Sequence, residues 1–154
     1  MSRAKSADPQ PPQLGALIRL ATQAMGEELA RWIEASGFEG IQPAHSAAIQ
    51  PLWRRPDGLR ITELAKASRI TKQSMSALVA DLAAAGYVER VGDPDDARAV
   101  RVRLTPRGRT YARAVRAFSR QVEAHWAERV GAERINELRT TLELLRTSVF
   151  LAGE

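Results

Sequence analysis

Five arginines crowd the segment that begins VGDPDDARAVRVRLTPRG at Val91. They are Arg98, Arg101, Arg103, Arg107 and Arg109, and no acidic residue interrupts them after Asp96. A guanidinium group is planar and always charged, and it can donate two parallel hydrogen bonds to one phosphate. An arginine at the tip of a hairpin can also enter a narrow, electronegative minor groove. The chemistry offered by this spacing is the binding of a polyanion.

The acidic residues around Pro94 have different expected tasks. Asp93 directly precedes the proline and favours a type I bend, so we interpret it as structural. Asp96 and Arg98 are two positions apart, which on an extended segment places both on one side, where the carboxylate can hold the guanidinium. Alternatively, Asp96 is only a turn-forming acid. Both interpretations of Asp96 stay open.

A second polar set lies within TKQSMSALVADL, residues 71–82. The apolar residues recur with the period of a helix and are Met75, Leu78, Val79 and Leu82. The opposite face and the amino end carry Thr71, Lys72, Gln73, Ser74, Ser76, Ala77 and Ala80. Glutamine can bond adenine at two points, serine and threonine can donate to bases or phosphate, and alanine can contact thymine methyl groups. This face suits a major groove, and the alternative is a polar face turned to solvent.

The elements that must position these residues are two short helices followed by a hairpin. Residues 61–86 divide at a turn over Ser68 to Ile70, with Thr62 and Thr71 as expected helix caps. The first helix is expected to pack through Leu64, Ala65 and Ile61, and the pair forms a helix-turn-helix.

The period then changes to two over YVERV and AVRVRL, which predicts two strands of a hairpin, or wing. Val100, Val102 and Leu104 are expected to face the helices. Arg101 and Arg103 are expected on the opposite face, presented outward.

Longer amphipathic patterns flank this centre. Apolar residues from Leu14 to Ile33 predict a helix that ends at Gly37, and Pro43 starts a second one that Pro51 should kink or shorten. Thr105 and Pro106 begin a long helix that carries Tyr111 to Trp126. A last helix follows Gly131 and carries apolar residues from Ile135 to Val149.

The expected fold is mainly α with a small β-hairpin wing, a winged helix-turn-helix between long terminal helices. We divide the chain into a mobile tail (1–12), a dimerisation helix (13–42), a DNA-binding module (43–109) and carboxy-terminal dimerisation helices (110–154). The terminal helices carry more apolar surface than the module can cover, which predicts a homodimer. The alternative is a monomer in which they pack on their own module.

Composition and charge narrow the possible classes of protein further. The chain has 154 residues and a net charge of +5, and residues 54–109 alone hold 12 Lys or Arg against 7 Asp or Glu, so the whole excess lies there. With no cysteine there is no thiol redox switch, and His45 and His125 are too far apart in sequence to suggest a metal site. No cofactor, metal or membrane span is expected, and a cytoplasmic location follows by default.

The segment from TELAKASRITKQS through DPDDAR to LTPRG resembles the winged helix-turn-helix of the multiple antibiotic resistance regulator (MarR) family over residues 43–109. The resemblance implies a homodimer on a pseudo-palindromic double-stranded operator, with Thr71, Lys72, Gln73, Ser74 and Ser76 in the major groove. It also implies that Asp96 and Arg98 form the wing pair. One departure is Arg69, where such turns often have glycine, so a left-handed backbone or an altered turn is expected there.

Such regulators commonly release DNA when a small aromatic or phenolic compound binds between the dimer helices and the winged module. The candidates here are Trp32, His45, Ile49 and Trp53, and the alternative for each is ordinary core packing. His45 could also respond to pH.

The leading hypothesis is therefore a sequence-specific transcription regulator, a repressor released by a small aromatic ligand. The competing one is a winged-helix protein-interaction module without sequence-specific DNA binding. No catalytic motif supports an enzyme.

Overall fold

The computed structural model describes residues 11–147, so most of the expected tail and Val149 lie outside the described residues. Six α-helices and three strands follow one another in this range. In chain order they are α1 (Leu14–Ser36), a 3₁₀ turn (Pro43–His45), α2 (Ser46–Trp53), β1 (Leu59–Arg60), α3 (Ile61–Ser68), α4 (Lys72–Ala84), β2 (Val88–Asp93), β3 (Asp96–Leu104), α5 (Pro106–Val130) and α6 (Ala132–Thr147). The expected fold class, mainly α with a small β wing, is confirmed.

The first two helical segments lie where the sequence predicts them. α1 ends at Gly37, whose φ of 72° is the left-handed conformation that a helix-terminating glycine supplies. Pro43 begins a 3₁₀ turn that runs into α2. Pro51 lies inside α2, and the helix ends soon after it, at Trp53. The helix is short, as expected, and Pro51, which cannot donate a backbone hydrogen bond, lies in its last turn.

The helix-turn-helix differs from expectation at its first cap. Thr62 is wrong as the cap of α3, because the helix already begins at Ile61. The extended Arg60 precedes it, and the Arg60 backbone N–H donates to Glu63 Oε2 at 2.7 Å. A glutamate that reaches back from the third position can cap a helix end as a threonine would. Thr71 is confirmed as the cap of α4, because its Oγ1 accepts from the backbone N–H of Ser74 at 3.0 Å.

The turn between α3 and α4 takes the left-handed backbone expected of it. Arg69 has φ 53° and ψ 41°, the single non-glycine residue with positive φ among those described. A residue with a Cβ pays a small conformational cost there, which glycine would avoid.

The hairpin belongs to a three-stranded antiparallel sheet with the order β1-β3-β2. The sequence analysis missed β1, because two residues are too few to display a period. Leu59 pairs with Val102 and Arg60 with Arg101, so β1 joins the wing to the start of α3. Gly58 precedes it with φ 85°, and a Cβ there would lie 2.5 Å from the Val102 carbonyl oxygen. Glycine is therefore needed for this close strand approach.

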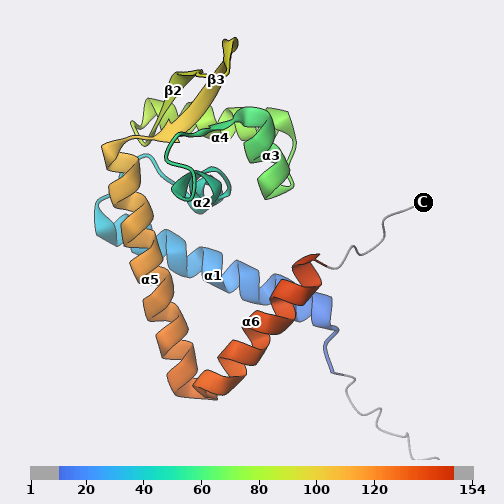
Figure 1. Cartoon of the computed structure of the whole chain (residues 1–154). Helices are drawn as coiled ribbons and strands as arrows, with labels where there is room; N and C mark the ends of the chain where they lie inside the picture. Colours follow the sequence, from blue (N-terminus) through green and yellow to red (C-terminus); the bar gives the residue numbers. More distant parts are fainter. Residues whose placement is uncertain (1–10, 148–154) are drawn as a thin grey trace, which may run out of the picture.

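One residue of the expected core face of the wing is exposed. Val102 and Leu104 are buried, but Val100 is 49% exposed, so its expected burial is wrong. Figure 1 shows the reason, because β2 and β3 project beyond the helices and leave nothing for the outer half of the hairpin to pack on. Alternation along a strand predicts which face a residue takes, whereas the neighbouring elements decide whether that face is covered.

The core lies between α2, α3, α4, the sheet and the start of α5. Its largest fully buried side chains are Leu52, Leu64, Met75, Val79, Leu82, Tyr87, Val102 and Tyr111. Thr105 caps α5, with Oγ1 accepting from the Gly108 backbone N–H at 3.0 Å. Gly108 lies against the backbone carbonyl of Tyr87, the residue before β2. The first turn of α5 is therefore in direct backbone contact with the start of β2.

The terminal helices extend away from the winged module. In Figure 1 α5 leads away from the wing, α6 returns toward α3, and α1 crosses below α2. The return of α6 agrees with a hydrogen bond from the Arg69 guanidinium to the Arg146 carbonyl at 3.1 Å. Large apolar side chains remain exposed on α1 and α6, among them Leu14, Leu17, Ile18, Leu20, Met25, Leu138 and Leu142. A single chain therefore leaves a substantial apolar surface uncovered on these helices.

Candidate nucleic-acid interface

The amino end of α4 presents the polar residues that the sequence singles out. Thr71, Lys72, Gln73 and Ser74 are exposed and Ser76 is half-buried. The hydroxyl groups of Thr71 and Ser74 lie 2.8 Å apart and are tied to the cap of the helix. Lys72 and Gln73 thus offer the extended side chains of this group, and the hydroxyls are held at the helix end.

The middle of the same face carries small side chains. Ala77 and Ala80 are exposed, whereas Met75, Val79 and Leu82 on the other side are buried in the core. An exposed helix face that is polar at its amino end and small in the middle can approach base edges closely.

The tip of the wing carries one arginine, Arg98, whose guanidinium group is not in an ion pair within residues 11–147. Arg98 is exposed. Asp96 Oδ1 accepts from the backbone N–H of Arg98 at 3.0 Å, and Asp96 Oδ2 lies 3.7 Å from the Arg60 guanidinium. The carboxylate therefore shapes the turn and does not hold the Arg98 side chain, which matches the second of the two interpretations.

Arg103 is exposed, as expected of the outer face, and Arg101 is half-buried, but both guanidinium groups are already paired with carboxylates. Arg101 pairs with Asp95 at 2.9 Å, and its side chain is 23% exposed. Arg103 pairs across the strands with Glu89 at 2.8 Å. The sequence places these acids 6 and 14 residues away from their partners, so only the hairpin register brings them together.

Two further arginines serve the packing of α5. Arg107 lies over the Tyr87 ring at 4.6 Å and donates to the Glu39 carbonyl at 3.3 Å. Arg109 donates to the Leu104 carbonyl at 2.8 Å. Of the five arginines in this segment, Arg98 is the one whose side chain has no such contact within residues 11–147.

The turn end of β2 holds a buried carboxylate, Asp93, that the sequence analysis treated only as a turn residue. The side chain of Asp93 has no exposed surface. Arg101 and Arg60 hold the pKa of the Asp93 carboxyl well below its usual range, and the backbone N–H of Asp95 adds a further hydrogen bond. Arg60 was missed because nothing in the sequence marks a partner 33 residues away.

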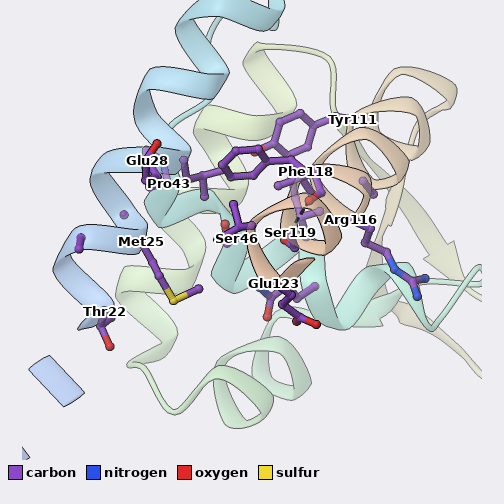
Figure 2. A pocket seen from close by; sticks show the side chains of 18 of the residues that line it. Thr22, Met25, Glu28, Pro43, Ser46, Tyr111, Arg116, Phe118, Ser119 and Glu123 are labelled. Carbon is purple, nitrogen blue, oxygen red and sulfur yellow. Dashed lines mark hydrogen bonds between the residues drawn. The ribbon is translucent and has the colours of Figure 1, made fainter. Parts of the chain in front are cut away.

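A cavity of about 1020 Å³ lies between α1, α2 and α5. Of the expected ligand contacts, Ile49 and Trp53 line it, whereas Trp32 and His45 do not. The sequence analysis missed Met25, Phe118 and Trp126 in its wall. Figure 2 shows Met25 reaching from α1 across the opening toward α5, where Ser119 and Glu123 stand.

The two expected contacts outside the cavity wall belong to the packed interior. The ring of Trp32 stacks on Phe118 at 5.0 Å and lies 6.2 Å from Tyr111. His45 is buried, and its Nδ1 accepts from the Gln42 backbone N–H at 2.9 Å. Burial lowers the pKa of His45, and Asp81 at 3.9 Å opposes this only in part. Both residues thus match the core-packing alternative.

A helix-turn-helix whose second helix exposes a polar face, followed by a projecting hairpin with an arginine near its tip, defines a winged helix-turn-helix protein. No helix within residues 11–147 is long and apolar enough to cross a membrane.

Comparison with known proteins agrees with this class. Residues 39–99 match the family model described as MarR family. The HTH-type transcriptional repressor Rv2887 of Mycobacterium tuberculosis is 30% identical over 117 residues, which cover 68% of this chain and 84% of that protein. This chain therefore belongs to the MarR family, whose members are transcription regulators and not enzymes.

Solved structures confirm the fold. MepR of Staphylococcus aureus in complex with DNA gives a TM-score of 0.75 at 20% identity, over 90% of this chain and 100% of that one. FabT of Streptococcus pneumoniae in complex with DNA gives 0.74 at 20% identity, over 86% and 92%. At this level of identity the likeness concerns the fold.

Proposed function

We propose that this MarR-family chain binds a specific, pseudo-palindromic operator as a homodimer, with α4 in the major groove and the wing in the adjacent minor groove. The observation that carries this proposal is the combination of the exposed polar face of α4 with the unpaired Arg98 on the projecting hairpin. Two structures of similar fold, MepR and FabT, are complexes with DNA, which supports the same partner for this chain.

The site residues take unequal parts in this proposal. Thr71, Lys72, Gln73, Ser74 and Ser76 contact bases or phosphates from α4, with Ser76 the least accessible. Arg98 enters the minor groove, and Asp96 shapes the turn that carries it. Arg101 and Arg103 contribute less, because neighbouring carboxylates already neutralise their charge.

The homodimer follows from the apolar faces of α1 and α6. Leu17, Ile18, Leu138 and Leu142 are all more than one third exposed in the single chain. A second copy would bury this surface and place two copies of α4 on successive turns of the duplex. Repression is the activity we propose, because the 30% identical relative from Mycobacterium tuberculosis is named a transcriptional repressor.

Selection of bound duplexes from a random pool tests the proposal. We expect a two-fold symmetric consensus with half-sites about 10 to 10.5 base pairs apart. On that duplex, Arg98→Ala should weaken specific binding by about 1 to 3 kcal/mol in fluorescence anisotropy, since a minor-groove contact is lost. Anisotropy at several salt concentrations measures how many ion contacts the arginine contributes.

The competing function, a protein-interaction module, makes the opposite prediction. Such a module would bind selected and scrambled duplexes equally. An Arg98→Ala variant with unchanged operator affinity would remove the wing from the mechanism.

We also propose that a small aromatic ligand in the cavity between α1, α2 and α5 releases the operator. Its wall combines apolar and aromatic surface from Ile49, Trp53 and Phe118, which suits a planar ligand. Trp32 and His45 act behind this wall, as packing residues.

A fluorescent aromatic anion, anilinonaphthalene sulfonate, serves as the probe for this site. Ser119→Trp fills the cavity from α5 and should weaken probe binding at least about tenfold, equivalent to about 1.4 kcal/mol. Thr110→Trp is the matched control, because Thr110 is exposed on the same helix and does not line the cavity. The probe should displace operator from the wild type and the control. Equal displacement from all three proteins would place its site elsewhere.

A further inference from the structure

The buried carboxylate of Asp93, at the turn end of β2, has three polar partners. Arg60 Nε donates to Asp93 Oδ2 at 2.6 Å, and Arg101 Nε lies 3.0 Å from the same oxygen. The backbone N–H of Asp95 donates to Oδ1 at 3.0 Å. A buried carboxylate with this many partners holds the surrounding groups in one arrangement. Any other arrangement would leave the buried charge without an ion-pair or hydrogen-bond partner.

Arg60 links this carboxylate to the helix-turn-helix. Its backbone precedes α3 and is bonded there to Glu63, while its β1 position pairs with Arg101 of β3. One residue therefore connects the first helix of the DNA-binding motif, the central strand and the buried carboxylate. The outer hairpin has little apolar support, since Val100 is 49% exposed. Polar contacts of Asp93 at the turn end of β2 therefore have to hold its direction.

We propose that Arg60, acting through Asp93, is a positioning residue that fixes the wing relative to α3 and α4 and so places Arg98 for DNA. This inference rests on the proposed function. It assigns to Arg60 an effect on DNA affinity that operates through another residue and not through a DNA contact of its own.

A direct contact between Arg60 and a phosphate is the rival explanation, because its side chain is 40% exposed. The two explanations predict opposite signs for Asp93→Asn. Removing this negative charge frees Arg60 and should tighten binding if Arg60 contacts phosphate. It should weaken binding if the ion pair positions the wing.

Operator affinity of the full-length protein is measured by anisotropy for Arg60→Gln, Asp93→Asn, Arg98→Ala and the two double variants that contain Arg98→Ala. We expect Arg60→Gln and Asp93→Asn each to weaken binding between about threefold and thirtyfold. In the Arg98→Ala background each should cost less than about twofold, because the residue they position is gone. Asp57→Asn is the control, with the same charge change at an exposed turn residue near β1.

Hydrogen exchange of the backbone amides of residues 97–100 supplies a readout that does not involve DNA. Exchange should accelerate in Arg60→Gln and Asp93→Asn and stay unchanged in Asp57→Asn. Circular dichroism at the assay temperature confirms that each variant is folded.

The inference is overturned if Asp93→Asn tightens binding, if the effects of Arg60→Gln and Arg98→Ala simply multiply, or if wing exchange does not change. Failure of the wild type to prefer operator over scrambled duplex would instead refute the proposed function. The exchange measurement would still decide whether Arg60 holds the wing.

Discussion

Ala77→Glu should abolish specific operator binding without unfolding the protein. Ala77 lies in the middle of the exposed face of α4, the face that contacts base edges in the proposed complex. In that complex a carboxylate at this position would meet electronegative base edges and phosphates, and it is longer than the alanine methyl group that it replaces. Like charges brought together at an interface cost several kcal/mol, so we expect a loss of about 3 kcal/mol or more, over 100-fold. Anisotropy on the selected duplex measures this loss.

The matched control is Ala84→Glu, which makes the same substitution at an exposed position at the end of the same helix. Glutamate is a good helix former, so both variants should remain folded. A negative charge near the end of a helix costs only about 0.3 to 1 kcal/mol of stability. If Ala77→Glu binds the operator within about threefold of Ala84→Glu, α4 is not the element that enters the groove.

Gly108→Ala should destabilise the fold by about 2 to 4 kcal/mol, against the usual benefit of alanine in a helix. Gly108 is in the first turn of α5, and an added Cβ would collide with the Tyr87 carbonyl and approach Leu104 Cδ2 to 3.2 Å. To remove this steric clash, α5 must move away from Tyr87, the residue before β2. That movement strains the hydrogen bond from the Thr105 backbone N–H to Tyr87 O, now 3.0 Å, and the Thr105 cap.

Thermal and urea unfolding at one fixed protein concentration measure the change, since the stability of an oligomer depends on concentration. Gly92→Ala is the control, because nothing lies within 4 Å of a Cβ added there and Gly92 lacks a positive φ. It should change stability by less than about 0.5 kcal/mol. A Gly108→Ala variant as stable as this control would show that α5 can shift without loss.

The local features of the fold could be predicted because they depend on neighbours a few residues apart. The helical periods, the caps at Thr71 and Thr105, and the left-handed Arg69 all arise from contacts within about one turn of chain. The hairpin followed from strict alternation around a proline turn. The prediction that Thr62 caps α3 was wrong because Glu63 and Thr62 are both acceptable capping residues. The extended backbone of β1 decided between them.

The candidate site was only partly predictable. The sequence marks Arg98 and the polar face of α4, and these are exposed as expected. It also marks Arg101 and Arg103, which the register of β2 and β3 pairs with Asp95 and Glu89. An arginine in an ion pair and a free one look alike in a sequence.

By itself the sequence determined the class of element at each position, the winged architecture and the segment that carries the excess positive charge, since periodicity, capping and composition are properties of short stretches. Only the tertiary structure decided which charges remain free, that Val100 lacks cover, and that the buried Asp93 pairs with the partly exposed Arg60. Those outcomes depend on distances between residues such as Arg60 and Asp93, 33 positions apart, which no local pattern encodes.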